Sequence, residues 1–232
     1  MDLIWEGLQK ALAMLLSGDV ELWRVAFLTL RVSGTATIIS VLVGVPLGVA
    51  LALARFPGLR LLMALVNTGM GMPPVVVGLW VTILLWRNGP LGELGLMYSP
   101  TAMIIAQCVI ALPVVTAFTA AGIAQLDPRL TLQLRAMGAS RWQLCLLLVR
   151  EARLSVLAAV IAGFGAVVSE VGASMMVGGN VLGQTRVLTT SIVMEVSRGN
   201  FEVALALSLI LLFLAFLVVA ALTYLQRREQ GR

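Results

Sequence analysis

A run of 23 residues without a charged side chain, from Val32 to Ala54, most constrains what this chain can fold into. A helix of about 20 apolar residues crosses the roughly 30 Å hydrocarbon core of a bilayer, so this run is long enough to span a membrane. The whole chain is 60% hydrophobic and only 12% charged, whereas soluble domains carry about 25% charged residues. These features predict an all-α integral membrane protein.

Five apolar stretches of this kind follow one another along the chain. Each is long enough to cross the membrane as a helix, and the five predicted spans lie at about 32–54, 61–86, 100–123, 154–177 and 203–224. Residues 1–18 carry an apolar helical face but are too few for a span, which favours a helix lying in the membrane interface. We therefore expect one membrane domain over residues 1–232 that crosses the bilayer five times.

Glycine and proline residues interrupt the predicted spans. Gly71, Pro73 and Pro74 break the second span and leave backbone groups without intrahelical partners, a state that is tolerated only against protein or water. We therefore assign these three residues to a translocation path. Gly44 and Gly48 lie four residues apart in the first span, where they allow a neighbouring helix to approach closely.

Basic residues gather at three places between or after the spans. Ten of the sixteen lie at Arg55 and Arg60, between Arg129 and Arg153, or in the C-terminal tail, with three acids among them. The remaining segments hold six basic residues and, besides Glu170, seven acids. Because lysine and arginine are enriched on the cytoplasmic side of membrane proteins, this pattern predicts the N-terminus outside and the C-terminus inside. Basic residues spread through short loops do not indicate nucleic-acid binding.

The segment 127–153 holds five of these arginines. It cannot lie in the hydrocarbon, where each arginine would cost at least about 2.5 kcal/mol. Leu130, Leu134 and Met137 form an apolar helical stripe, and Gly138 then allows a turn. The pattern predicts a short helix, a glycine turn and a second helix on the cytoplasmic side. Such a loop between spans indicates a docking surface for another subunit.

The inventory of reactive side chains disfavours catalysis by this chain. There is no histidine, and the only lysine, Lys10, lies outside any glycine-rich phosphate-binding loop, so ATP must be hydrolysed by a partner. Cys108 and Cys145 suggest neither a disulfide framework nor a metal site. Glu170 is the only acid within a span, and no second acid or base accompanies it as an intramembrane enzyme requires. A secondary transporter or channel is the alternative, because the broken spans could line a path by themselves, although five spans give no inverted repeat.

Eight consecutive residues of the predicted loop resemble the cytoplasmic signature of ABC importer permeases, in which a glycine separates two short coupling helices. They are Arg135, Ala136, Met137, Gly138, Ala139, Ser140, Arg141 and Trp142. The acid of that signature is replaced by Leu132, and its closing Leu-Pro pair falls at Arg150 and Glu151. The resemblance implies that these eight residues, Met137 aside, couple the permease to an ATPase subunit.

A longer match begins near the end of the fourth span. Residues 169–173 and a polar section after them resemble the oxyanion branch of these permeases, with tungstate permeases nearest and molybdate and sulfate permeases behind. The matching residues of the polar section are Gly178, Gly179, Asn180, Gly183, Thr185, Arg186, Leu188, Thr189 and Thr190. Residues 67–78, with their paired prolines, are similar to the same group. The resemblance covers nearly the whole chain and implies import of an oxyanion, most closely tungstate.

The predicted substrate path combines the broken second span with this polar section. Its residues are Gly71, Pro73, Pro74, Glu170, Gly172, Asn180, Thr185, Thr189 and Thr190. Neutral amide and hydroxyl groups can donate hydrogen bonds to a passing dianion without holding it as a ring of arginines would. A carboxylate would repel the anion, so we expect Glu170 to serve in structure or gating. Arg186 is either a solvated loop charge or a contact for a docked binding protein.

The resemblance also implies the rest of the assembly. We expect a second copy of this chain, two ATPase subunits that bind ATP and magnesium, and an external solute-binding protein, with no cofactor in this chain. Five spans of one chain enclose little, whereas two copies around a two-fold axis would surround a central path. The expected location is the inner, or plasma, membrane of a prokaryote, as a multi-pass protein in contact with lipid. The same residues allow other small solutes, such as amino acids or sugars.

Overall fold

The computed structural model describes residues 2–18 and 20–230, and these residues form helices without a β-strand. In chain order the elements are α1 (Asp2–Leu16), α2 (Val20–Leu53), α3 (Leu59–Met70), α4 (Pro74–Leu85), the short 3₁₀ helix η1 (Gly92–Leu94), α5 (Pro100–Ala124), α6 (Pro128–Ala136), α7 (Arg141–Glu151), α8 (Arg153–Val168), α9 (Gly172–Gly178), α10 (Leu188–Ser197) and α11 (Phe201–Gln230). The chain is therefore all-helical, as predicted.

Three helices, α2, α5 and α11, are long and apolar enough to cross a membrane. Two bent pairs, α3 with α4 and α8 with α9, pass the same test when each pair is taken together, which allows up to five spans in the described residues. The α3–α4 pair bends by 100° at residues 71–73, where the paired prolines predict a break. The α8–α9 pair bends by 59° at residues 169–171. The sequence analysis noted Glu170 as an interruption of the predicted span 154–177 but did not predict a bend there.

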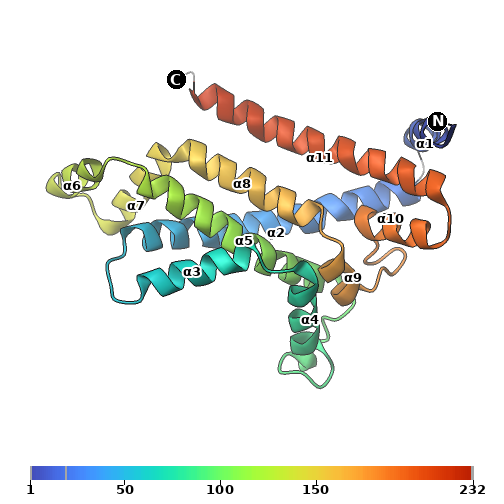
Figure 1. The fold of residues 1–232 in the computed structure, drawn as a ribbon, viewed down its shortest axis with the longest axis horizontal. Coiled ribbons are helices and arrows are strands. Elements are labelled where there is room, and N and C mark those ends of the chain that lie inside the picture. The colour runs from blue at the N-terminus through green and yellow to red at the C-terminus, as the bar shows by residue number, and fades with distance from the viewer. Residues whose placement is uncertain (1, 19, 231–232) are drawn as a thin grey trace.

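The long helices lie alongside one another and give the molecule two ends (Figure 1). The α6–α7 pair and the turn between α2 and α3 lie at one end, and α1 and α10 lie at the other. The side chain of Gln226, late in α11, donates to the Leu154 carbonyl at 3.4 Å, which places the C-terminal part of α11 beside the start of α8. The segments that carry the three basic groups therefore share one end of the molecule.

The helix α2 begins at Val20, ahead of the predicted start of the first span at residue 32. Leu22 and Val25 are buried in these added turns and pack against residues of α10 and α11. Arg24 and Arg31 are exposed, outside the buried face. The helix thus extends beyond the charge-free run that defines the predicted span, because a helix continues as long as one of its faces can be buried.

The helix α5 lies at the centre of the fold, where it packs against α2, α3, α4, α8 and α9. Glycines allow the helices to approach this closely. A β-carbon on Gly48 of α2 would stand only 2.7 Å from the Thr116 carbonyl oxygen of α5. On the α8 side, a β-carbon on Gly163 would stand 2.9 Å from Val115 Cγ2. The close approach predicted for Gly48 is confirmed, with α5 as the neighbouring helix.

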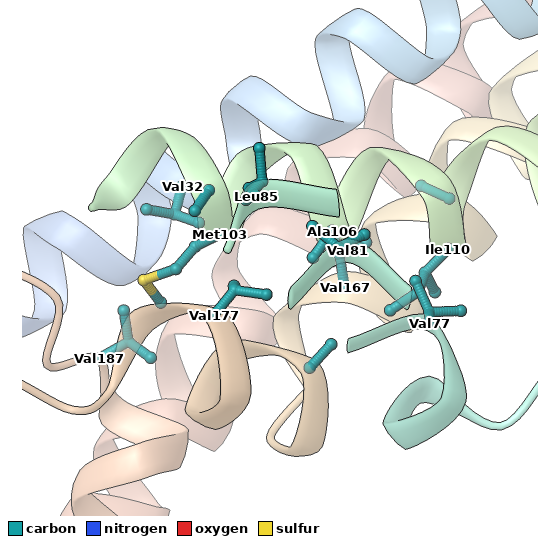
Figure 2. Close-up of a cluster of buried hydrophobic side chains, with 13 residues drawn as sticks. Val32, Val77, Val81, Leu85, Met103, Ala106, Ile110, Val167, Val177 and Val187 are labelled. Atoms are coloured by element: carbon teal, nitrogen blue, oxygen red, sulfur yellow. The ribbon is translucent and has the colours of Figure 1, made fainter. Parts of the chain in front are cut away.

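A cluster of buried apolar side chains joins α4 and α9 to the long helices (Figure 2). Its members come from α2, α4, α5, α8 and α9 and the start of α10, and they are Val32, Val77, Val81, Leu85, Ala102, Met103, Ala106, Ile110, Ala111, Val167, Ala173, Val177 and Val187. Helices as short as α4 and α9 are marginal alone in water and depend on tertiary packing. The cluster therefore fixes the broken segments against α5.

Candidate coupling surface and translocation path

The segment 127–153 folds into α6 and α7, the helix pair that the sequence predicts. The Asp127 carboxylate caps α6 by accepting from the Arg129 N–H at 2.8 Å. At the start of α7 the Ser140 hydroxyl accepts from the Gln143 N–H at 3.3 Å, and the Gln143 side-chain oxygen accepts from the Ser140 N–H at 2.9 Å. This reciprocal capping box satisfies two donors that the helix leaves open and fixes where α7 begins.

The turn between the two helices depends on the backbone of Gly138. Its φ is +81°, in the left-handed region that favours glycine. The Gly138 N–H donates to the Arg135 carbonyl at 3.0 Å, and the Ala139 N–H donates to the Leu134 carbonyl at 3.0 Å. Within the described part of the chain, beyond its immediate neighbours, no atom lies within 4 Å of a β-carbon built on Gly138. The position therefore needs glycine for its conformation and not for lack of space.

The outer face of the α6–α7 pair carries exposed apolar side chains among its arginines. Leu132, Met137 and Trp142 are 66%, 74% and 69% exposed. The predicted coupling residues are exposed as well, apart from the half-buried Ala139. Three large apolar side chains exposed on one short helix pair are suited to a protein interface.

The inner face of the same pair is anchored to the long helices. Leu144 and Leu148 of α7 are buried in one cluster with Val49 of α2 and Ile123 of α5. The chain passes from α5 into α6 and from α7 directly into α8. A displacement of the α6–α7 pair therefore acts on α2, α5 and α8 together.

Glu170 occupies the break between α8 and α9 and is buried. Its Oε1 accepts from the Ala173 N–H at 2.6 Å, which satisfies a backbone donor at the start of α9. Its backbone carbonyl accepts from the Thr189 hydroxyl at 3.0 Å. On the α8 side, the Ser169 hydroxyl donates to the Gly165 carbonyl at 2.8 Å. The Glu170 carboxylate thus caps the start of α9, and its carbonyl joins the break to α10, while its part in the substrate path stays a prediction.

Three polar side chains build the loop between α9 and α10. The Thr185 hydroxyl donates to the Gly178 carbonyl at 2.6 Å and accepts from the Val181 N–H at 2.9 Å. The Thr190 hydroxyl accepts from the N–H of Val187, the residue before α10, at 3.1 Å. It also lies 2.9 Å from Asn180 Oδ1, to which it can donate. Thr185 and Thr190 are fully buried. These groups hydrogen-bond within the chain, and their contact with a passing ion stays a prediction.

Gly172 brings the two helix breaks together. A β-carbon on Gly172 would stand 2.8 Å from Val75 Cγ2, and a β-carbon on Gly78 would stand 2.7 Å from the Ala173 backbone in α9. Since α4 begins at Pro74, the proline break of α3–α4 lies beside the Glu170 break of α8–α9. Residues 71–74 are exposed there. Two groups of predicted path residues that are far apart in the sequence are thus neighbours in the fold.

The sequence analysis missed two buried polar contacts that support this region. Gln107 of α5 donates to the Ser174 hydroxyl of α9 at 3.4 Å, and its Oε1 has no partner among residues 2–18 and 20–230. Thr29 of α2 accepts from the Leu188 N–H at 2.9 Å and so caps α10. Gln107 is the only amide side chain in its apolar stretch, a signal that could have indicated it. Thr29 carries no such signal.

The fold and the site define a class of protein. Broken helices packed against the central helix α5 of an apolar bundle, and an exposed helix pair at one end, are features of a membrane permease that works with a second subunit. The chain matches the family described as "Binding-protein-dependent transport system inner membrane component" over residues 44–231, and it belongs to that family.

Individual relatives match over nearly their full length. The tungstate uptake system permease protein TupB of Peptoclostridium acidaminophilum is 39% identical over 226 residues, which cover 97% of this chain and 99% of that protein. The protein of the same name from Campylobacter jejuni subsp. jejuni serotype O:2 is 34% identical, with 93% of this chain and 90% of that protein covered.

The fold has a counterpart among solved structures. A chain from an inward facing conformation of the MetNI methionine ABC transporter superposes with a TM-score of 0.75 at 24% identity, over 90% of this chain and 95% of that chain. The family match and the full-length relatives make the chain a multi-pass component of a prokaryotic inner membrane. It is a transport subunit of the ABC class and not an enzyme, and permeases of this class work with an ATPase and a solute-binding protein.

Proposed function

We propose that this chain is the permease subunit of an ATP-driven importer for tungstate. Two copies form the path, two ATPase subunits bind the cytoplasmic α6–α7 pairs, and a solute-binding protein delivers the ion from outside. The observation that carries the coupling to ATP is the capped α6–α7 pair, with Gly138 at its turn and Trp142 exposed on its outer face. The full-length likeness to two tungstate permeases supports the cargo.

In the proposed topology the chain crosses the membrane five times, with α2, α3–α4, α5, α8–α9 and α11 as the spans. The end that carries α6 and α7 is cytoplasmic, the N-terminus lies outside and the C-terminus lies inside. The gathering of the three basic segments at one end supports this orientation, because positive charge favours the cytoplasmic side.

The proposed mechanism transmits ATP-driven closure through the packing of α5 and α8. Closure of the ATPase subunits moves the α6–α7 pairs, and α5 and α8 follow because they continue directly from α6 and α7. The helix α5 also packs against α9, with the Gln107–Ser174 contact between them, and α8 runs into α9 through the Glu170 break. The movement therefore reaches the point where the α3–α4 and α8–α9 breaks meet. It opens the path alternately to the outside and to the cytoplasm.

The proposed path runs past this meeting point. Exposed Gly71, Pro73 and Pro74 face it from one break, and the break at Glu170 and Gly172 lies beside them. The side chains of Asn180 and Thr185 in the loop, and of Thr189 and Thr190 at the start of α10, form its supporting wall. None of these four side chains is charged, so a dianion passes without being trapped.

The binding-protein-stimulated ATPase activity of the complete complex tests this function. The complex is purified with its ATPase and binding protein, and the binding protein is loaded in turn with tungstate, molybdate or sulfate. We expect the greatest stimulation with tungstate and none without the binding protein. Stimulation by an amino acid or sugar alone would overturn the proposed cargo, and a chain that binds no ATPase subunit would overturn the proposed coupling.

A further inference from the structure

A cavity of about 500 Å³ opens between the first turns of α2 and the loop that precedes α10. It lies at the end of the molecule opposite α6 and α7, and it is separate from the helix breaks. Among the described residues, three arginines line it, Arg24, Arg31 and Arg186, against one acid, Glu21. The rest of its wall is largely apolar and includes Phe27. The cavity thus combines excess positive charge with an apolar lining.

Two of the arginines have no partner among the residues that the structure describes. Arg24 and Arg31 are seven residues apart, on the same face of α2 and about 10 Å apart along its axis. Neither forms a hydrogen bond or ion pair within residues 2–18 and 20–230, and both are exposed. Their guanidinium groups are therefore available to a ligand.

The third arginine is held in place by the protein. Arg186 is half-buried, lies 3.9 Å from the Glu21 carboxylate and donates to the Asn180 carbonyl at 3.4 Å. Its Nε is buried and has no partner in the described chain. An unpaired buried guanidinium nitrogen beside two free arginines fits a polyoxygen anion, which accepts several hydrogen bonds at once.

The position of the cavity along α2 places it at the level of lipid headgroups. The charge-free part of α2, residues 32–53, is about 33 Å long, close to the thickness of the hydrocarbon core. Arg31 directly precedes this part, so it lies where the hydrocarbon ends. Trp23 and Phe27 are 49% and 68% exposed in the same turns, and exposed aromatic side chains are typical of the membrane interface.

We infer that this cavity binds the phosphate group of an anionic phospholipid. Arg24 and Arg31 contact the phosphate oxygens, and an acyl chain runs along Phe27 toward the hydrocarbon. Arginine binds phosphate in a planar, two-pronged geometry. The apolar wall and the depth of Arg31 favour a lipid over a free oxyanion, which has no apolar part to bury. The lipid would join α2 to the loop before α10. The site does not depend on which solute the importer carries.

Native mass spectrometry of the delipidated, assembled transporter tests the inference. The complex is titrated with phosphatidylglycerol or phosphatidylcholine, for the wild type, Arg24→Gln, Arg31→Gln and the double variant. Arg87→Gln is the matched control, because Arg87 is exposed and does not line the cavity. Each arginine near an anionic membrane surface strengthens binding about fivefold. We therefore expect the affinity for phosphatidylglycerol to fall roughly 30-fold in the double variant. We expect no change in the control, and weaker phosphatidylcholine binding throughout.

Two further results would overturn the inference. One is equal affinity for phosphatidylglycerol in the wild type and the variants. The other is displacement of the lipid by inorganic phosphate or tungstate together with no preference for phosphatidylglycerol, which would make the cavity a site for free oxyanions. Arg24 and Arg31 have no partners within residues 2–18 and 20–230, so we expect the variants to assemble with ATPase subunits as the wild type does. If the double variant does not assemble, the single variants decide, with an expected loss of about fivefold each.

Discussion

Val75 of α4 lies directly against Gly172 of α9, since a β-carbon on Gly172 would stand 2.8 Å from Val75 Cγ2. Each residue follows a helix break, one made by prolines and one capped by Glu170. The contact therefore joins two short helices that are each too short to cross a membrane. It fixes the relative position of the two breaks.

This contact predicts a compensating pair of substitutions. Gly172→Ala should lower the free energy of unfolding in detergent by about 1–3 kcal/mol, the usual cost of overpacking, and should reduce uptake. Adding Val75→Ala removes the atom that the new methyl group meets, so the double variant should recover most of the loss. Gly165→Ala is the control, because nothing lies within 4 Å of its added β-carbon in the described chain. Additive losses in the double variant would show that the contact does not join the breaks.

The turn of the α6–α7 pair predicts a graded effect at Gly138. Gly138→Val forces a β-branched residue into a φ of +81°, at a cost of about 1–2 kcal/mol. It should lower the uptake per ATP hydrolysed, while the complex still assembles. Gly138→Asn should retain much more uptake, because asparagine tolerates the left-handed region and there is space for its side chain. Equal uptake and equal stimulated ATPase activity in Gly138→Val and the wild type would contradict a coupling role for this turn.

The hydrogen bond from Ala173 to Glu170 predicts that the carboxyl oxygen matters and its charge does not. Glu170→Gln keeps an oxygen that can accept from the Ala173 N–H, so it should retain uptake and thermal stability. Glu170→Ala leaves that buried donor unpaired and should lower the free energy of unfolding by about 1–3 kcal/mol. Thermal unfolding and uptake of both variants decide this. A glutamine variant as inactive as the alanine variant would mean that the charge itself takes part in gating.

The helical class and the coupling loop could be predicted from the sequence because their signals are local. Charge-free runs give apolar helices, and a glycine between two short periodic segments gives a turn with positive φ, as Gly138 has. The proline break before α4 is local in the same sense. These predictions do not require knowledge of which helices pack against one another.

The rest depends on contacts between distant residues. The early start of α2 follows from Leu22 and Val25 packing against α10 and α11, which no periodicity in one segment reveals. The break at Glu170 has no proline, and it forms because side chains there replace helical hydrogen bonds. Thr185 and Thr190 have a composition suited to binding an anion, and their internal hydrogen bonds appear only in the folded loop.

The proposed orientation predicts which residues an impermeant thiol reagent reaches in intact cells. With Cys108 and Cys145 replaced, a cysteine at Gln184 should be labelled from outside, because Gln184 is exposed and lies beside the first turns of α2 in the cavity described above. A cysteine at Arg141 should be labelled only after the membrane is opened. Labelling of the Arg141 position in intact cells would reverse the proposed topology.

ATP-dependent uptake by proteoliposomes is the measurement that tests the central proposal most directly. The vesicles contain this chain with its ATPase, and they receive the binding protein on the outside and ATP within. We predict accumulation of tungstate in preference to sulfate, and no accumulation without ATP or without the binding protein. Robust uptake of an amino acid or a divalent cation, with no uptake of any oxyanion, would contradict the proposed function.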